Sequence, residues 1–397
     1  MRRSASAVVC GLLLASLSVS PAGAASNGVQ RWAVCGEWRQ VPVHTNPYAT
    51  AVDIAVVSPY DGWMTTYIGY SLGTSYVYRW TGLRWEEVAF PTPSFGHPAP
   101  GNAVWELDAL AVVDPTQVWA VGAYAHYRSP GARRVVRPLT ARWDGTRWQL
   151  VPVAIPHLSG HLLGVASVPG TDRLWAVGVR YPHGNEAKTQ SLILRWNGAA
   201  WHRVPSPNPS ATANELIDVA ASGHTAIAVG ESLQGDALRS LAMHWNGRDW
   251  VRVAAPSPKA GAQLSAVTMT SPTTAWAVGE AYWPTYPHNH PPHGIILGWN
   301  GRRWTLTRML DRQSRFTDVV GAAYGDVWAV GQRGVRSADA YHPIAWHRTA
   351  AGWAPTKVPS VNGSFSAIDG TPHNLWVAHR EPHVGEDLAD LDTYHRC

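Results

Sequence analysis

RWNGAAWHRVPSPNP, residues 195–209, decides the fold because the chain repeats it. The pattern returns as RWDGTRWQLVPVAIP (142–156), HWNGRDWVRVAAPSP (244–258) and GWNGRRWTLTRML (298–310). In each copy two tryptophans flank an Asn-Gly or Asp-Gly pair, which favours a tight hairpin in which both turn positions have positive φ. A two-residue turn sets Trp196 opposite Ala199 and brings Trp201 to the same sheet face. We expect the two indoles to pack together between neighbouring repeats.

The hairpin belongs to a longer unit that occurs seven times. Each unit contains a Leu-x-x-Val phrase, and the second apolar anchors stand 48 to 56 residues apart, at Ile54, Leu110, Val165, Val219, Val267, Val319 and Ile368. A Trp-Ala-Val-Gly phrase follows, intact at Trp119, Trp175, Trp276 and Trp328, altered at Trp63 and Trp376, and headed by Ile227 in the fourth unit. Four short β-type runs per unit, without useful helical periodicity, predict an all-β, seven-bladed β-propeller with four antiparallel strands per blade.

The seventh unit ends before a fourth strand, and a matching segment stands near the N-terminus. Residues 37–42 (EWRQVP) resemble residues 200–205 (AWHRVP). We therefore expect the N-terminal strand to complete the last blade and close the ring, which removes two open sheet edges. The expected single propeller domain covers 26–397, with blades at approximately 51–93, 106–154, 161–208, 215–258, 263–310, 315–361, and 364–397 plus 30–44.

Residues 1–25 have the layout of a secretory signal peptide. Arg2 and Arg3 precede an apolar run, and small residues before position 26 provide a cleavage site. Removing the segment lowers the formal charge from +5 to +3, because these arginines are its only charged residues. That weak charge argues against nucleic acid, and no later run is apolar enough to enter a membrane. We expect a secreted monomer without a cofactor.

Two cysteines remain after the signal peptide, near opposite ends of the chain. In an exported protein, Cys35 and Cys397 are expected to form a disulfide. Ring closure would bring them together, since Cys397 ends the third strand of the last blade and Cys35 precedes its fourth.

The order of an apolar-Val-Gly phrase, an aromatic phrase and Trp-x-x-Val-Pro resembles kelch repeats and the central domain of galactose oxidase. The resemblance covers residues 30–397 and implies the same propeller class. Kelch repeats have two glycines after the second strand, whereas one glycine stands here, at Gly122, Gly178, Gly230, Gly279 and Gly331. With both remaining cysteines at the closure, no thiol is left for the cysteine–tyrosine crosslink of copper-radical oxidation.

Three sets of ionisable residues are candidates for chemistry. Glu231 and Glu280 follow the glycine in adjacent units and are either an acid/base pair or solvated loop residues paired with cations such as Arg239. Asp53, Asp218 and Asp318 precede the strand anchor, which favours structural hydrogen bonds to the next blade over a functional role. His288, His290 and His293 either bind a metal ion or belong to an exposed Pro/His-rich loop.

Connections between the second and third strands vary most and contain many aromatic and hydrogen-bonding residues. We expect the binding residues to include Tyr124, His126, Tyr127, Arg128, Tyr181, His183, Tyr282, Trp283, Tyr286, His288, Arg333, Arg336, Tyr341, His379, Arg380 and His383. The first hypothesis is a non-enzymatic scaffold that binds carbohydrate or protein on this face. The alternatives are a carbohydrate-active hydrolase or lyase with its site on the same face, and a purely structural role. Carboxylates or a His-metal site converging at the mouth of the ring would argue against the non-enzymatic hypothesis.

Overall fold

The computed structural model describes residues 36–45, 49–68, 73–93, 104–127, 134–258, 261–282, 292–322, 325–334, 341–380 and 391–396. All of them belong to one compact unit, Cys35–Cys397. Strands form nearly all of its regular structure, and the described helix is a single 3₁₀ turn, η1 (Pro182–Gly184). Within these ranges no helix is long and apolar enough to cross a membrane.

Four sheets contain four consecutive antiparallel strands each. They are β10 (Gly160–Ser167), β11 (Leu174–Arg180), β12 (Gln190–Trp196) and β13 (Trp201–Arg203); β14 (Ala213–Ser222), β15 (Thr225–Gln234), β16 (Ala237–Trp245) and β17 (Trp250–Arg252); β18 (Gly261–Ser271), β19 (Thr274–Tyr282), β20 (His293–Trp299) and β21 (Trp304–Arg312); and β22 (Ser314–Gly321), β23 (Val327–Gly334), β24 (Tyr341–Thr349) and β25 (Gly352–Thr356).

An eight-stranded sheet holds the first two repeats. Its strands are β2 (Thr50–Ser58), β3 (Asp61–Ile68), β4 (Thr74–Trp80), β5 (Trp85–Val88), β6 (Val104–Asp114), β7 (Gln117–Tyr127), β8 (Arg134–Trp143) and β9 (Trp148–Leu150). A single parallel pairing, Thr74 with Trp105, joins β4 to β6.

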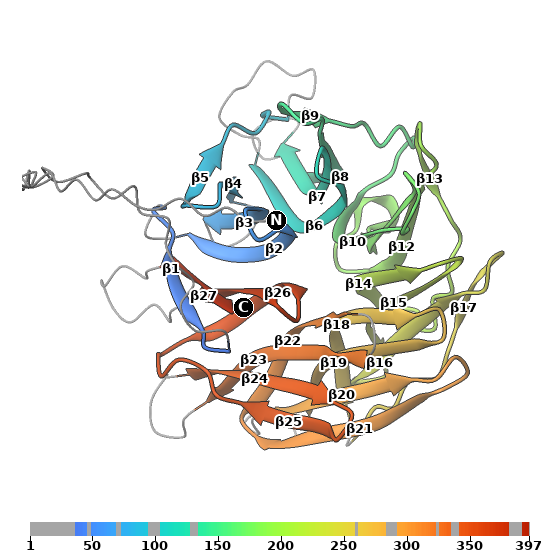
Figure 1. The fold of residues 1–397 in the computed structure, drawn as a ribbon. Coiled ribbons are helices and arrows are strands. Elements are labelled where there is room, and N and C mark those ends of the chain that lie inside the picture. The colour runs from blue at the N-terminus through green and yellow to red at the C-terminus, as the bar shows by residue number, and fades with distance from the viewer. Residues whose placement is uncertain are drawn as a thin grey trace, which may run out of the picture. The chain divides into compact units, whose positions relative to one another are not determined.

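The last sheet joins the two ends of the described chain. Its order is β1 (Arg39–Pro42), β28 (Leu391–Arg396), β27 (Asn374–Arg380) and β26 (Ser364–Thr371). Arg39 lies opposite His395 and Pro42 opposite Asp392, in an antiparallel pairing. The match between residues 37–42 and 200–205 predicts this strand and its neighbour. In Figure 1 the sheets follow one another around a common centre, and the strands nearest that centre are β2, β6, β10, β14, β18, β22 and β26.

The hairpin turns differ from the two-residue turn that the Asn-Gly pairs favour. Trp196 is paired directly with Trp201, so four residues connect the strands. Gly198 has a φ of +100°, and it is the one residue of this loop with positive φ. The Asn197 side chain accepts hydrogen bonds from the backbone N–H groups of Ala199 and Ala200, both at 2.9 Å, and so stabilises the wider loop. The two tryptophans still share one face.

Tryptophans pack between successive sheets, as the repeat predicts. The ring of Trp119, from β7, lies 4.8 Å from that of Trp196 and 5.5 Å from that of Trp201. Trp63 and Trp175 make equivalent contacts with the next pair of indoles. Trp376, from β27, packs on Trp80 and Trp85 of the first repeat. Where Ile227 replaces the tryptophan, it packs in the same cluster as Trp299 and Trp304.

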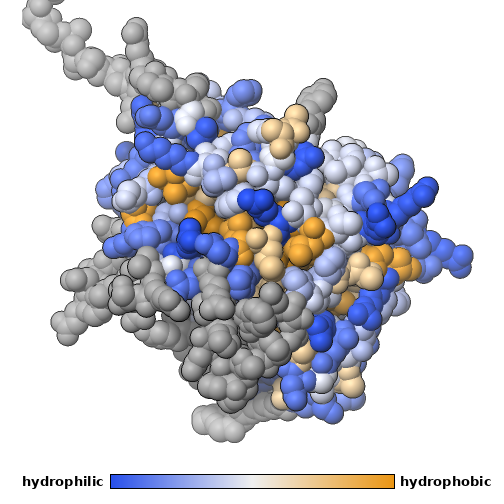
Figure 2. Space-filling model, turned by 90° about the horizontal axis from the view of Figure 1, so that it is seen from below, coloured by the Kyte–Doolittle hydropathy of each residue, from blue (hydrophilic) through white to orange (hydrophobic). Residues whose placement is uncertain are grey.

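Apolar residues also reach the surface. Figure 2 shows them gathered in a band between hydrophilic residues on one side of the molecule. The exposed apolar side chains include Val251 of β17 and Leu306 and Met309 of β21, strands that lie at the outer edges of their sheets.

Candidate functional site

The innermost strand of every repeat has a register shift at the same position. It lies between Leu107 and Ala109 in β6, and equivalent shifts occur in β2, β10, β14, β18, β22 and β26. A β-bulge inserts one extra residue, bends the strand and changes the direction of nearby side chains. The repeats therefore present the residues around the bulge in the same way.

The single glycine of each Val-Gly phrase lies opposite this bulge. A Cβ at Gly230 would lie 2.1 Å from the carbonyl oxygen of Glu215, which no real contact permits. A Cβ added at any of the other four glycines would lie 1.9 to 2.2 Å from the equivalent carbonyl oxygen; these are Gly122, Gly178, Gly279 and Gly331. In these five repeats glycine is required because the neighbouring backbone approaches too closely for any side chain, whereas Thr66 and His379 occupy the equivalent position in the first and seventh repeats.

The residue whose carbonyl contacts that glycine carries a polar side chain in five successive repeats. These residues are Glu106, His161, Glu215, Gln263 and Arg315. They stand near the start of their strands, at the sheet ends that the connections between second and third strands share. Asp108, Glu231 and Glu280 lie beside them, and we call Glu106, Asp108, His161, Glu215, Glu231, Glu280 and Arg315 the acidic arc.

One half of the acidic arc brings together an imidazole and two carboxyl groups. His161 Nε2 lies 2.6 Å from Asp108 Oδ2, across two neighbouring repeats. A carboxyl oxygen of Glu106, a carboxyl oxygen of Asp108 and a ring nitrogen of His161 all lie within 4.8 Å of one another. Burial and the neighbouring Asp108 raise the pKa of Glu106 to about 7. Burial alone would lower the pKa of His161, but Asp108, Glu106 and Glu215 outweigh it and raise that pKa.

The other half contains three glutamates. Glu215 and Glu231 lie directly opposite each other on β14 and β15. Burial, followed by the charges of Glu215 and Glu280, raises the pKa of Glu231 to about 7. Its Oε2 is buried and has no hydrogen-bond partner in the described part of the chain. A neutral carboxyl at this position is therefore able to donate a proton near pH 7.

Glu280 is held by its neighbours and is 4% exposed. Its Oε1 accepts a hydrogen bond from Gln263 Nε2 at 2.7 Å and another from the Tyr282 hydroxyl. Burial raises the pKa of Glu280, although these hydrogen bonds and the nearby Arg315 act against the shift. Burial and Glu280 together raise the pKa of Tyr282, so its hydroxyl remains a donor.

Aspartates deeper in the same strands have a different role. The Asp218 carboxyl accepts hydrogen bonds from the backbone N–H of Val219 and from that of Val267 in the next repeat, both at 2.7 Å. Asp53 and Asp318 make the equivalent bonds to Leu110 and Ile368. The predicted structural role of these three aspartates is confirmed. The sequence did not single out a fourth, Asp369, which accepts from Val56 N at 2.6 Å.

Burial raises the pKa of all four of these aspartates. The pKa of Asp218 rises to about 7 and that of Asp318 to about 6. The pKa values of Asp53 and Asp369 also rise, for the same reason. Because backbone N–H groups donate to both oxygens of Asp53, Asp218 and Asp318 and to Oδ2 of Asp369, these carboxyl groups are not candidates for ligand binding.

The predicted binding residues are spread over the described sheet ends. Tyr181 is half-buried; burial, then Glu186 and Glu215, raise its pKa to about 12. His183 lies in η1 with a φ of +52°. Tyr282 touches the acidic arc through Glu280, whereas Arg333 pairs with Asp311 at 2.5 Å. The backbones of His126 and Tyr127 lie in β7, where Tyr124 is half-buried, and Tyr341 and Arg380 are exposed.

Glu231 and Glu280 occupy strands and not solvated loops, and the charge of Glu280 contributes to the raised pKa of Glu231. His379 is buried, and its Nε2 lies 2.8 Å from the Asn362 carbonyl oxygen. His293 is also buried; its Nδ1 lies 2.8 Å from the Leu310 carbonyl oxygen, and its Nε2 has no partner among the described residues. The described ranges do not include Cys35, Arg128, Trp283, Tyr286, His288, His290, Arg336, His383 or Cys397.

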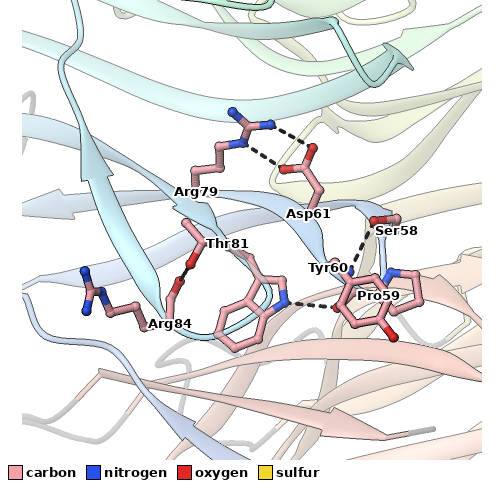
Figure 3. A network of polar contacts seen from close by, with 8 residues as sticks. Ser58, Pro59, Tyr60, Asp61, Arg79, Thr81 and Arg84 are labelled. Atoms are coloured by element: carbon pink, nitrogen blue, oxygen red, sulfur yellow. Dashed lines mark hydrogen bonds and ion pairs between the residues drawn. The ribbon is translucent and has the colours of Figure 1, made fainter. Parts of the chain in front are cut away.

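A second polar cluster lies at the opposite sheet ends (Figure 3). Arg79 forms a bidentate ion pair with Asp61, at 2.8 and 3.0 Å. The Trp80 indole donates to the Pro59 carbonyl oxygen at 3.1 Å. These residues border a cavity of about 400 Å³ that Tyr60, Glu86 and Trp143 also line. The polar groups of Arg79 and Asp61 bond to each other, and the Trp80 indole bonds to the turn at Pro59. Because these groups already have partners within the protein, this cluster is a weaker candidate for ligand binding than the acidic arc.

Sequence reasoning missed most of the acidic arc. Glu106, Asp108, His161, Glu215 and Arg315 were not singled out, although they stand next to the first apolar residue of the Leu-x-x-Val phrase. The available signal was positional: charged or polar residues recur directly before a residue that the repeat keeps apolar.

No protein-family model and no curated protein matches the sequence. Solved structures share its fold. YCF48 from Cyanidioschyzon merolae aligns at 16% identity over 91% of this chain and 98% of that chain, with a TM-score of 0.51. An ulvan lyase of polysaccharide lyase family PL25, bound to -[GlcA(1-4)Rha3S]-, aligns at 11% identity over 89% and 95%, with a TM-score of 0.55. At these identities the likeness concerns the fold alone, which is all-β and of the β-propeller type.

Proposed function

We propose that this protein binds a carbohydrate at the acidic arc. The observation that carries the proposal is the convergence of side chains from five successive repeats at one end of their sheets. Carboxyl oxygens accept hydrogen bonds from sugar hydroxyls, and the Tyr282 phenol and Gln263 amide supply donors. A few converging polar groups on a rigid scaffold are typical of small-ligand sites.

The charge of the acidic arc favours neutral or amino sugars. Five carboxyl groups outnumber His161 and Arg315 there, so a uronic acid or sulfated sugar would meet like charge. The ulvan lyase of similar fold is described with a ligand that contains GlcA and Rha3S. We therefore do not transfer that ligand to this chain.

A carbohydrate-active hydrolase or lyase is the second candidate. Its support is Glu231, a buried carboxyl whose pKa is raised to about 7 and whose Oε2 has no partner in the described chain. A general acid near neutral pH requires such a group, and Glu215 or Glu280 would act as the second carboxylate. Several carboxyl groups at one place favour a site that also carries out acid/base chemistry on a bound carbohydrate over a site that only binds it.

The test is a panel of neutral, amino and uronic-acid polysaccharides, with binding and product release measured for each. Wild type is compared with Tyr282→Phe and Glu231→Gln, and with Glu86→Gln at the opposite sheet ends as the control. We expect binding to neutral or amino sugars, weakened by Tyr282→Phe and unaffected by Glu86→Gln. Preference for uronic acids, or a protein partner and no glycan, would contradict the proposal.

We also propose that the sheets are seven blades of a closed, kelch-like ring. The eight-stranded sheet divides into two four-stranded blades at the single Thr74–Trp105 pairing. Closure is supported by the Val56 N–Asp369 hydrogen bond and by Trp376 packing on Trp80 and Trp85, which join the last repeat to the first.

Export with a Cys35–Cys397 disulfide belongs to the same proposal. It rests on the arginines and apolar run of residues 1–25 and on the pairing of β1 with β28. Intact mass of the secreted, non-reduced protein tests both parts. Retention of residues 1–25, or two free thiols, would contradict the corresponding part.

A further inference from the structure

We infer that Glu106, Asp108 and His161 bind a divalent transition-metal ion. The inference does not depend on the carbohydrate proposal. It starts from three side chains that two neighbouring inner strands, β6 and β10, bring to one point. Each offers one ligand atom, and these atoms lie within 4.8 Å of one another.

Two carboxyl groups of one strand reach the same place because Glu106 and Asp108 lie two residues apart on β6, a spacing that puts side chains on one face of a strand. Asp108 is the extra residue between Leu107, which is paired with Gly122, and Ala109, which is paired with Val121. His161 stands at the start of β10, opposite Val179, and its Nε2 already lies 2.6 Å from Asp108 Oδ2. The backbone of both strands is fixed by pairing on the second strand, so the site is built on rigid elements.

The distances suit a metal with bonds of about 2.0–2.2 Å to nitrogen and oxygen. Ligand atoms around such an ion are separated by roughly 3.4 Å if the geometry is tetrahedral. Atoms within 4.8 Å reach that spacing through small side-chain rotations. An ion between Nε2 and the Asp108 oxygen would take the place of the proton that now links them.

The Glu106 carboxyl is the second observation that points to a cation. No group among the described residues donates a hydrogen bond to it, although it is half-buried and close to Asp108. The basic groups whose charges act on Glu106 are His161, which pairs with Asp108, and Arg134, which pairs with Glu186 at 2.6 Å. In the described part of the chain, the two carboxyl groups of Glu106 and Asp108 therefore have one neighbouring hydrogen-bond donor between them, the imidazole of His161.

One imidazole and two carboxylates favour Zn²⁺ or Mn²⁺ over Ca²⁺, which prefers six to eight oxygen ligands. Three protein ligands leave at least one position for water or a ligand hydroxyl. Such a position would open toward the remainder of the acidic arc.

The test is titration of the chelator-treated full-length mature protein with Zn²⁺, Mn²⁺ and Ca²⁺, followed by calorimetry and by thermal unfolding. We expect one Zn²⁺ or Mn²⁺ per chain, a rise in melting temperature on loading, and no comparable effect of Ca²⁺. Since even indirect partners of metal ligands change affinity about 10–100-fold, His161→Gln and Glu106→Gln should each weaken binding by about 100-fold or more.

His224→Gln, an exposed histidine in the turn between β14 and β15, is the matched control and should leave affinity unchanged. His290→Gln tests the competing histidine cluster of the sequence. Circular dichroism and unaltered apo unfolding establish that each variant folds. Stoichiometric binding that survives Glu106→Gln and His161→Gln, or that only His290→Gln abolishes, would overturn the assignment. So would the absence of any stoichiometric binding by folded wild type.

Discussion

Two sets of buried carboxyl groups stand a few residues apart on the same inner strands. Asp218 has both oxygens occupied by backbone N–H groups and joins one repeat to the next. Glu231 lies opposite Glu215 on the adjacent strand β15, and its Oε2 has no hydrogen-bond partner among the described residues. Burial raises the pKa of both, so their hydrogen bonds and not their pKa values separate the structural carboxyl from the one that we propose as functional.

Asp218→Asn is expected to destabilise the fold by about 1–3 kcal/mol at pH 5, because the amide nitrogen cannot accept one of the two backbone N–H groups. Chemical denaturation at fixed pH measures the change. Asp236→Asn, at an exposed turn, is the control. Equal stability of Asp218→Asn and wild type at pH 5 would contradict the structural role.

The same variant should alter how stability depends on pH. The pKa of Asp218 is about 7 in the folded protein, above its value near 3.9 in an unfolded chain. Between these values the folded state binds more protons, so the stability that Asp218 contributes is complete below about pH 4 and is lost as pH rises through 7. We therefore expect the deficit of Asp218→Asn to shrink between pH 5 and pH 8. A deficit that is constant or grows would show that the pKa is not raised.

Glu231→Gln separates binding from turnover at the acidic arc. If Glu231 is a general acid, the variant should retain ligand binding and lose about 10²–10⁴-fold in turnover, since the amide cannot donate a proton as an acid does. Rates of product release from the best glycan of the panel measure this. If wild type binds without turnover and the variant changes affinity alone, the site is a binding site only.

The sequence identified the structural aspartates but few residues of the acidic arc. Asp53, Asp218 and Asp318 recur at one position of the repeat, and recurrence reveals a shared structural role. Glu106, His161, Glu215 and Arg315 share a position in the repeat but belong to three residue types of different charge. Their proximity depends on the radial arrangement of five inner strands, which no local pattern contains.

At the scale of the element, the bulge and the glycine opposite it form one unit. The bulge presents the arc residue, and the glycine admits its carbonyl oxygen at a distance that excludes a Cβ. One glycine therefore suffices in each of the five repeats that carry it. The recurrence of this glycine was visible in the sequence, but its cause, the close approach of the paired strand, became clear only from the structure.

Gly230→Ala is expected to cost about 2 kcal/mol or more, because its Cβ would lie 2.1 Å from the Glu215 carbonyl oxygen and force the strands apart. Gly334→Ala, in β23, is the matched control: its Cβ would meet atoms at 3.5 Å or more, in ordinary contact. Thermal unfolding compares the two. Similar melting temperatures for both variants would mean that the close approach at the bulge is not required.

In the hairpins, the sequence predicted where the turn lies but not how many residues it contains. The Asn-Gly pair marks the correct place, but Trp196 pairs with Trp201 across four residues because Asn197 bonds to the following backbone. Side chains alternate between the two faces of a strand, so a loop of four residues leaves Trp196 and Trp201 on the same face, as a loop of two would. The predicted packing of the tryptophans was therefore correct, whereas the predicted length of the turn was wrong.

At the scale of the whole molecule, the sheet that contains β1 and β28 joins segments more than 350 residues apart, as the Thr393 Oγ1–Val41 O hydrogen bond of 3.0 Å shows. The displaced copy of the repeat at residues 37–42 made this pairing predictable. The order of sheets was predictable for the same reason, because each repeat contains its own strands.

A chain that begins at residue 46 should lose β1 and expose the edge of β28. We expect a lower melting temperature and self-association, since an unpaired edge accepts strands from other molecules. Unfolding and size-exclusion chromatography compare it with residues 26–397. Cys35→Ser in the longer chain separates the effect of the strand from that of the disulfide. Unchanged stability of the shortened chain would mean that β1 is dispensable.

The pairing of β1 with β28 also orders the events of biosynthesis. Chains are made from the N-terminus at about 5–20 residues per second, so residues 39–42 wait for nearly the whole chain before Leu391–Arg396 exists to receive them. Native pairing of such remote segments is slow, and partly folded chains expose strand edges meanwhile. Of the described strands, β1 is made first and its partner β28 last, and the interval before they pair is when a chaperone would be needed most.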